Sequence, residues 1–80
     1  MLNKIEVLLL AELDNKKKYT PINSVSIDSF DTAKCMSINT IYKKICNLEK
    51  LNYVQKGLKE SKKNTYFITK LGIEILESYK

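Results

Sequence analysis

The stretch from Ser37 to Leu51, SINTIYKKICNLEKL, has the residue pattern of an amphipathic helix around which the rest of the chain is organised. At about 100° per residue, its apolar and polar side chains fall on opposite faces. The apolar stripe consists of Ile38, Ile41, Ile45 and Leu48, and the polar face of Asn39, Thr40, Lys43, Asn47 and Lys50. Ser37 suits the amino-terminal cap, and Asn52 suits the left-handed position that often follows a helix. The sequence therefore predicts a helix with one buried face and one basic, polar face.

The residues before this helix predict a shorter helix joined to it by a brief turn. Ser26 is placed to cap a helix in which Ile27, Phe30 and Ala33 recur at three-residue spacing. Residues 19–25, which include a proline and several β-branched side chains, favour an extended segment or a short edge strand. Two helices separated by a short turn form a helix-turn-helix unit, in which the first helix braces the second against a DNA duplex.

The residues after the helix predict a β-hairpin and a final helix. Residues 53–60 and 65–69 have the composition of two strands, with Gly57 as a candidate bulge. Thr69 suits the cap of a last helix over residues 70–79. The apolar residues of that helix at core spacing are Leu71, Ile75, Leu76 and Tyr79.

The first 14 residues predict a helix that is apolar on nearly every side. Its core positions are Ile5, Leu8, Leu9 and Leu13, and further apolar residues off that stripe are Leu2, Val7, Leu10 and Ala11. A helix of this kind requires cover on more than one face. We expect the final helix to supply part of the cover and a second copy of the chain to supply the remainder. The predicted homodimer interface consists of Leu2, Val7, Leu10 and Ile73.

Length and charge predict one basic domain over residues 1–80. The apolar fraction of 44% is that of a folded globule. The net charge is +5, and residues 37–70, with 8 Lys and 2 acidic residues, carry +6 of it against −1 for the rest. Such asymmetry indicates a polyanionic partner, although a lysine-rich surface also serves solubility.

The sequence lacks the residues that are typical of several function classes. Cys35 and Cys46 are 11 positions apart in a chain without His, which argues against a zinc or haem site. We expect two reduced thiols, and redox sensing by Cys46 is the less favoured alternative. No cofactor or metal is predicted. Without His or a phosphate-binding glycine loop, an enzyme is the weakest interpretation. The longest apolar run, residues 7–11, is too short to cross a bilayer, so we expect a cytoplasmic protein without membrane contact.

The predicted order of elements resembles the winged helix-turn-helix transcriptional regulators, particularly the MarR, PadR and ArsR-like group. Three segments carry the resemblance: S-x-x-T-I-Y-K at 37–43, L-E-K-L-N-Y-V at 48–54 and Y-F-I-T-K-L-G at 66–72. The sequence departs from the group at Asp31, Cys35 and Asn52, where a small apolar residue, Gly and Gly are usual. The resemblance implies a mostly helical α+β fold, with a three-helix core, a two-stranded wing and a carboxyl-terminal helix.

The resemblance implies a sequence-specific regulator of double-stranded DNA, which we expect to be a repressor. Helix 37–51 would enter the major groove and wing 53–69 would contact the DNA backbone. By side-chain chemistry, the expected base-reading residues are Ser37, Asn39, Thr40, Lys43 and Asn47, and the expected phosphate contacts are Lys44, Lys56, Lys62 and Lys63. The alternative is a winged-helix protein-interaction module of a replication or phage regulatory assembly, since fold alone does not define function. A small-molecule effector is left open.

Overall fold

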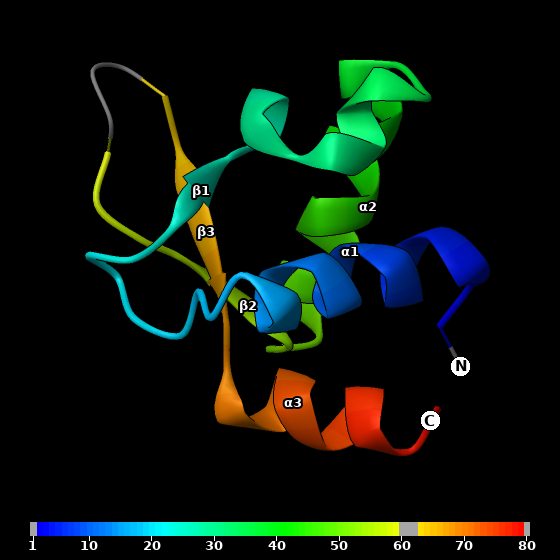
Figure 1. Cartoon of the computed structure of the whole chain (residues 1–80), viewed down its shortest axis with the longest axis vertical. Helices are drawn as coiled ribbons and strands as arrows, with labels where there is room; N and C mark the ends of the chain where they lie inside the picture. The colour runs from blue at the N-terminus through cyan, green and yellow to red at the C-terminus, as the bar shows by residue number, and fades with distance from the viewer. Residues whose placement is uncertain (1, 60–62, 80) are drawn as a thin grey trace.

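The computed structural model describes residues 2–59 and 63–79, which form a helical domain around a small antiparallel sheet (Figure 1). The elements in chain order are α1 (Lys4–Asn15), β1 (Val25–Ser26), the 3-10 turns η1 (Ile27–Ser29) and η2 (Asp31–Lys34), α2 (Ile38–Lys50), β2 (Val54–Lys56), β3 (Thr65–Ile68) and α3 (Lys70–Glu77). This arrangement confirms the predicted mostly helical winged-helix fold.

Helix α2 forms where the sequence predicts it, and both of its ends carry the predicted signals. The Ser37 hydroxyl accepts a hydrogen bond from the Thr40 amide at 3.2 Å. Beyond the carboxyl end, Asn52 has φ = 65°, the left-handed conformation that Asn tolerates better than most residues. Ile41, Ile45 and Leu48 are fully buried, as predicted. The prediction for Ile38 was wrong, because 52% of this residue is exposed at the amino end of the helix.

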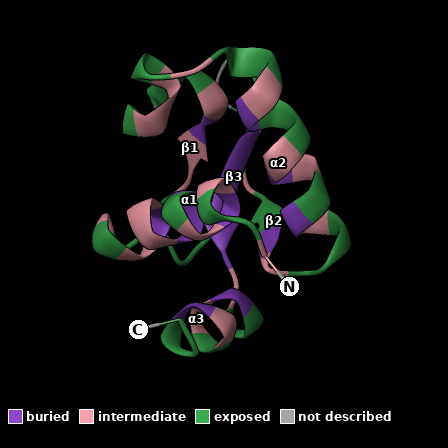
Figure 2. Ribbon diagram, turned by 90° about the vertical axis from the view of Figure 1, so that its right-hand side faces the viewer, coloured by how far each residue is buried: buried purple, intermediate pink, exposed green. Residues whose placement is uncertain are grey.

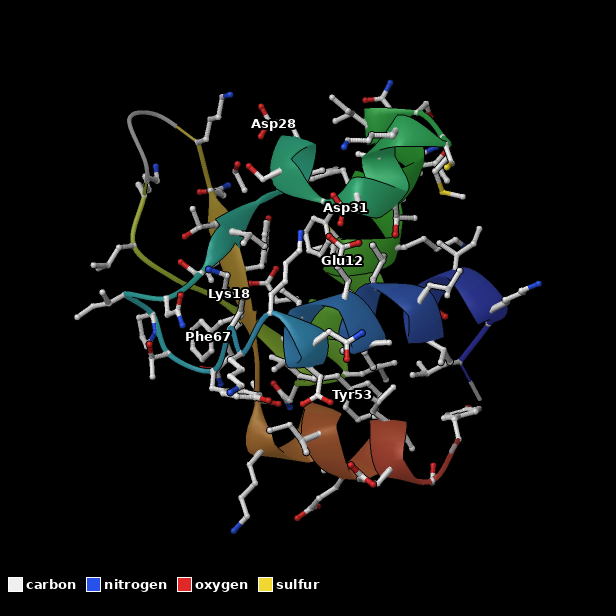
Figure 3. The ribbon with its side chains drawn as sticks, viewed as in Figure 1. Glu12, Lys18, Asp28, Asp31, Tyr53 and Phe67 are labelled. Carbon is white, nitrogen blue, oxygen red and sulfur yellow. The ribbon has the colours of Figure 1, made fainter. Side chains whose placement is uncertain are left out.

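The predicted bracing helix is instead two short 3-10 turns. They are separated by Phe30, whose extended backbone (φ −69°, ψ 136°) lets its ring enter the core with 1% exposure. The Ser26 hydroxyl does not cap the first turn; it donates to the Asp28 carboxylate at 2.7 Å. The second turn is capped from a distance, because Glu12 of α1 accepts from the amides of Asp31 and Thr32 at 2.8 and 3.2 Å (Figure 3).

The sheet has the order β1-β3-β2, with β3 in the centre and both of its neighbours antiparallel to it. Val54 pairs with Ile68 and Val25 pairs with Tyr66. All four residues of β3 are buried, as the purple ribbon at the centre of Figure 2 shows. The strands are shorter than predicted, and Gly57 follows β2 rather than interrupting it. The extended segment predicted over 19–25 pairs with the sheet only from Val25.

The core of one chain covers different residues of α1 from those that the sequence predicts. The core assignment of Leu8 was wrong, because this residue is 47% exposed. This helix packs against α2, α3 and β3, and Leu9, Leu10 and Leu13 are completely buried. The assignment of Leu10 to a dimer interface was therefore wrong, because α2, α3 and β3 surround α1 on several sides. Leu2, Val7 and Ile73 are partly buried against the same core.

The starts of the other two helices are also defined by side-chain caps. Helix α1 starts at Lys4, after a capping box in which Asn3 and Glu6 exchange backbone-to-side-chain hydrogen bonds at 2.9 and 3.0 Å. Helix α3 starts after Thr69, whose hydroxyl accepts from the Gly72 amide at 3.0 Å, as predicted. Side chains that bond the first free amides define these starts.

Candidate nucleic-acid interface

The amino-terminal half of α2 presents a polar and cationic surface. Ser37, Asn39 and Lys43 are exposed, whereas Thr40 is half-buried. The hydroxyls of Ser37 and Thr40 lie 2.8 Å apart, so the two side chains form one local unit at the start of the helix. Since the opposite face of α2 is anchored in the core by Ile41, Ile45 and Leu48, this polar surface is held on a rigid element.

Asn47 differs from the other predicted base-reading residues. Its side-chain amide donates to the carboxylate of Glu6 on α1, a residue that is only 4% exposed. A buried carboxylate requires hydrogen-bond donors, and Asn47 supplies one. The structure thus joins Asn47 to α1, in a contact that sequence spacing did not predict, and this contact uses one of the two N–H groups of its side-chain amide.

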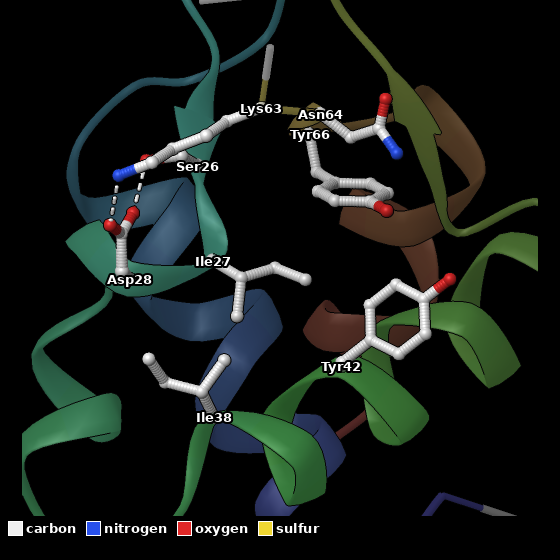
Figure 4. Close-up of a pocket in the computed structure, with 8 residues that line it drawn as sticks. All are labelled: Ser26, Ile27, Asp28, Ile38, Tyr42, Lys63, Asn64 and Tyr66. Atoms are coloured by element: carbon white, nitrogen blue, oxygen red, sulfur yellow. Dashed lines mark hydrogen bonds and ion pairs between the residues drawn. The ribbon is translucent and has the colours of Figure 1, made fainter.

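The tip end of the wing, just before β3, is joined to η1 by an ion pair. The ammonium of Lys63 lies 2.5 Å from the Asp28 carboxylate, and Figure 4 shows this pair at one side of the hollow between the wing and α2. The Lys63 ammonium, together with the Ser26 hydroxyl, holds the pKa of Asp28 below its ordinary value. Lys63, a predicted phosphate contact, is therefore already paired with an acidic residue of the protein itself.

The other predicted phosphate contacts lie in different surroundings. Lys56 at the end of β2 is exposed, and Lys44 of α2 is half-buried. Lys62 lies outside the described residues. Two further lysines whose role the sequence did not predict, Lys16 and Lys34, lie 3.6 and 3.9 Å from the Asp31 carboxylate. These contacts place positive charge beside Asp31, the last acidic residue before α2 in the sequence.

A hollow of about 340 Å³ separates the start of α2 from the wing (Figure 4). Its lining residues are Ser26, Ile27, Asp28, Ile38, Tyr42, Lys63, Asn64 and Tyr66. The Tyr66 side chain is fully buried, and no atom of the described residues lies in hydrogen-bonding geometry with its hydroxyl. Burial is the main cause that raises the pKa of Tyr66 to about 12, and the nearby Cys46, Glu49 and Tyr42 side chains add to this rise. The sequence did not predict this hollow.

The described residues contain no cluster of three or more His, Cys, Asp or Glu side chains that could hold a metal ion. Within the same residues, no helix is long and apolar enough to cross a membrane. Cys35 is exposed and Cys46 is half-buried, and both are free thiols.

Comparison with solved structures relates this geometry to two proteins. TubR from Bacillus megaterium pBM400 superposes with a TM-score of 0.81 at 16% identity, over 98% of this chain and 86% of that one. The DNA-binding TubR fragment from Clostridium botulinum superposes with a TM-score of 0.76 at 29% identity, over 100% of this chain and 99% of that one. The chain is similar to TubR over its whole fold. No protein-family model and no curated protein matches the sequence.

The likeness to TubR supports the winged-helix prediction at the level of the fold. The narrower resemblance to the MarR, PadR and ArsR-like group stays a prediction, because the two similar structures are TubR proteins and neither is described as a member of that group.

Proposed function

We propose that the protein is a sequence-specific regulator that binds double-stranded DNA, with α2 in the major groove and the β2–β3 wing along the backbone. The observation that carries the proposal is the exposed pair Asn39 and Lys43, held beside the wing on a fold shared with the DNA-binding TubR fragment. Helices presented in this way enter the major groove with their amino-terminal residues against base edges. We further propose that DNA occupancy by the protein represses transcription.

The proposed roles follow from side-chain chemistry. Asn39 is suited to a bidentate contact with adenine, and Lys43 can donate to guanine. Ser37 and Thr40 can bond a base or a phosphate. Lys44, Lys56, Lys62 and Lys63 are proposed phosphate contacts, and we assign Asn47 to support of the helix through Glu6. Phosphate contacts position the protein, whereas base contacts select the sequence.

We also propose that two copies associate through α1 and α3. Leu8 on α1 and Tyr79 after α3 are 47% and 41% exposed, and Leu2, Val7 and Ile73 are partly buried nearby. A domain this small gains stability by covering such residues with a second copy. A two-fold dimer would present two copies of α2 to successive major grooves, roughly 34 Å apart, and so favour a pseudo-palindromic site.

A salt-dependent titration tests the central proposal. The purified protein is titrated with duplex DNA from the region upstream of its own gene, at several salt concentrations. The slope of log affinity against log salt is expected to be about −0.9 for each phosphate neutralised. A flat response would overturn DNA binding through the basic face.

The exposed apolar residues Leu8, Leu51 and Leu71 favour a second candidate, a protein-interaction module. Its distinguishing result is the absence of duplex binding at every salt concentration, together with recovery of a protein partner on α1 or α3. The same titration therefore separates the two functions.

A further inference from the structure

Two large side chains on the proposed DNA-facing half of α2 are exposed although they are largely apolar. Ile38 and Tyr42 are 52% and 48% exposed, whereas Ile41, Ile45 and Leu48 of the same helix are completely buried. Residues four positions apart lie on one face of a helix, so Ile38 and Tyr42 form one stripe. In Figure 4 both side chains border the hollow, across from the Tyr66 ring, and no element of the described chain covers them.

The surroundings of this stripe indicate what kind of molecule covers it. Asn39 and Lys43, which follow Ile38 and Tyr42 directly in sequence, are exposed polar and cationic residues. On the other side lie Lys63 of the wing and its ion-pair partner Asp28, so the excess positive charge beside the stripe comes from Lys43. A second copy of the chain would bring the same basic segment, with its net charge of +6 over residues 37–70, against itself. An anionic partner that also offers small apolar groups fits this combination better, because opposite charges attract and apolar contacts are gained together.

We propose that Ile38 and Tyr42 contact the C5-methyl groups of thymines in the major groove, and so select thymine at the positions they face. This inference rests on the proposed DNA binding. The thymine methyl is the apolar group that base edges present in the major groove. Tyr42 is suited to this role because its phenol ring is uncharged near neutral pH, and the Cys46 thiol one helical turn later raises its pKa further above the ordinary value.

The test removes the methyl groups without changing base pairing. The duplex that the protein binds best is first selected from a random library. It is then prepared with deoxyuridine in place of every thymidine, and the two affinities are compared at one salt concentration. Each lost methyl contact is expected to weaken binding about fourfold, the equivalent of burying one apolar carbon group. Equal affinity for the two duplexes would overturn the inference.

Variants separate direct contact from an effect of the methyl groups on DNA shape. Ile38→Ser is expected to bind both duplexes with nearly equal affinity, because its contact with the methyl is lost. Ile22→Ser is the matched control, since Ile22 is 85% exposed in the loop before β1 and should retain the wild-type preference. Circular dichroism checks that both variants fold. If Ile38→Ser and Tyr42→Ser each retain the full preference for thymine, DNA shape explains it and the inference fails.

The comparison also distinguishes this inference from the function on which it rests. If binding depends on salt but does not differ between the thymine and uracil duplexes, the proposed role of Ile38 and Tyr42 is contradicted and DNA binding stands. If the protein does not bind duplex DNA at all, the proposed function is contradicted as well. Both results, binding to duplex DNA and the difference between the two duplexes, are measured with the unmodified protein, so the test does not depend on the folding of any variant.

Discussion

At the scale of single residues, the region between α2 and the wing combines a buried polar group with an ion pair. The Tyr66 hydroxyl is enclosed without a partner in hydrogen-bonding geometry, and a few residues away Lys63 neutralises Asp28. An unsatisfied buried polar group costs free energy, whereas an exposed ion pair contributes little. Packing around the Tyr66 ring therefore stabilises this region more than its polar contacts do.

The substitution Tyr66→Phe tests that balance. Because it removes an unpartnered hydroxyl and keeps the ring, the free energy of unfolding in urea is expected to rise by up to about 1 kcal/mol. Tyr66→Ala, which empties the same site, is expected to lower it by about 3–5 kcal/mol. The control is Tyr53→Phe at a half-buried position. A clear loss of stability in Tyr66→Phe would mean that the hydroxyl has a partner after all.

The raised pKa of Tyr66 makes a prediction about alkaline pH. The neutral phenol is favoured in the folded state, where its pKa is about 12 against an ordinary 10.0. Its contribution to stability is therefore complete below pH 10.0 and is lost as the pH rises toward about 12. Thermal unfolding followed over this range should show a steeper decline for the wild type than for Tyr66→Phe. Parallel curves would contradict the assignment.

Base and phosphate contacts are predicted to respond differently to substitution. Asn39→Ala or Lys43→Ala should weaken binding to the preferred sequence by about 1–3 kcal/mol and leave binding to random DNA less affected. Lys56→Ala, at the exposed end of β2, should weaken both by similar factors and reduce the salt slope by about 1. Titration of each variant with both duplexes measures this. Equal losses for all three would show that the reading face lies elsewhere.

At the scale of elements, α3 is positioned by a close approach to the turn after α2. The backbone amide of Thr69 donates to the Tyr53 carbonyl at 3.0 Å, and the Thr69 hydroxyl donates to the carbonyl of Asn52 at 2.6 Å. Gly72 is buried at this crossing, and a Cβ there would overlap the Tyr53 carbonyl oxygen. The absence of a side chain at Gly72 therefore permits α3 to pack on the turn that ends α2.

The substitution Gly72→Ala sets helix propensity against packing. Propensity alone would stabilise the helix by about 1 kcal/mol. The new Cβ would overlap the Tyr53 backbone carbonyl and also crowd the Ile68 side chain, so we expect a net loss of roughly 1–3 kcal/mol in urea unfolding. Glu74→Ala, at an exposed position of the same helix, is the control and should be nearly neutral. A stabilised Gly72→Ala protein would show that α3 can shift away from the turn at little cost.

At the scale of the whole molecule, α1 is the central helix, and one large apolar side chain on its outer side, Leu8, is exposed. Leu9, Leu10 and Leu13 are closed inside one chain, whereas Leu8 is 47% exposed. The amino-terminal segment also meets the end of the chain, since the Leu2 amide donates to the Tyr79 hydroxyl at 3.0 Å. The surface proposed for association therefore includes residues from both ends of the chain.

Sedimentation at micromolar concentration tests the proposed homodimer. The wild type is expected to have the mass of two chains. Leu8→Glu, which places a charge on the exposed side of α1 without entering the core, should give a folded monomer with much weaker DNA binding. Ile22→Glu is the control for added charge at an exposed site away from α1. A monomeric wild type would leave this surface for a different partner.

Local sequence determined the order of the elements and most of their ends. The period of apolar residues defined α2, and the caps at Ser37 and Thr69 and the left-handed Asn52 lie where the sequence predicts them. These signals act over a few residues, so they can be inferred without knowing what the chain packs against.

Tertiary structure decided which apolar residues are covered and which polar residues have partners. Leu10 is buried and Ile38 is exposed because α1 lies among three elements while the start of α2 borders a hollow. Phe30 divides the predicted bracing helix because its ring enters the core. The pairings of Asn47 with Glu6 and of Lys63 with Asp28 join residues 41 and 35 positions apart. Contacts at such separations depend on how the elements pack, and local periodicity contains no information about that packing.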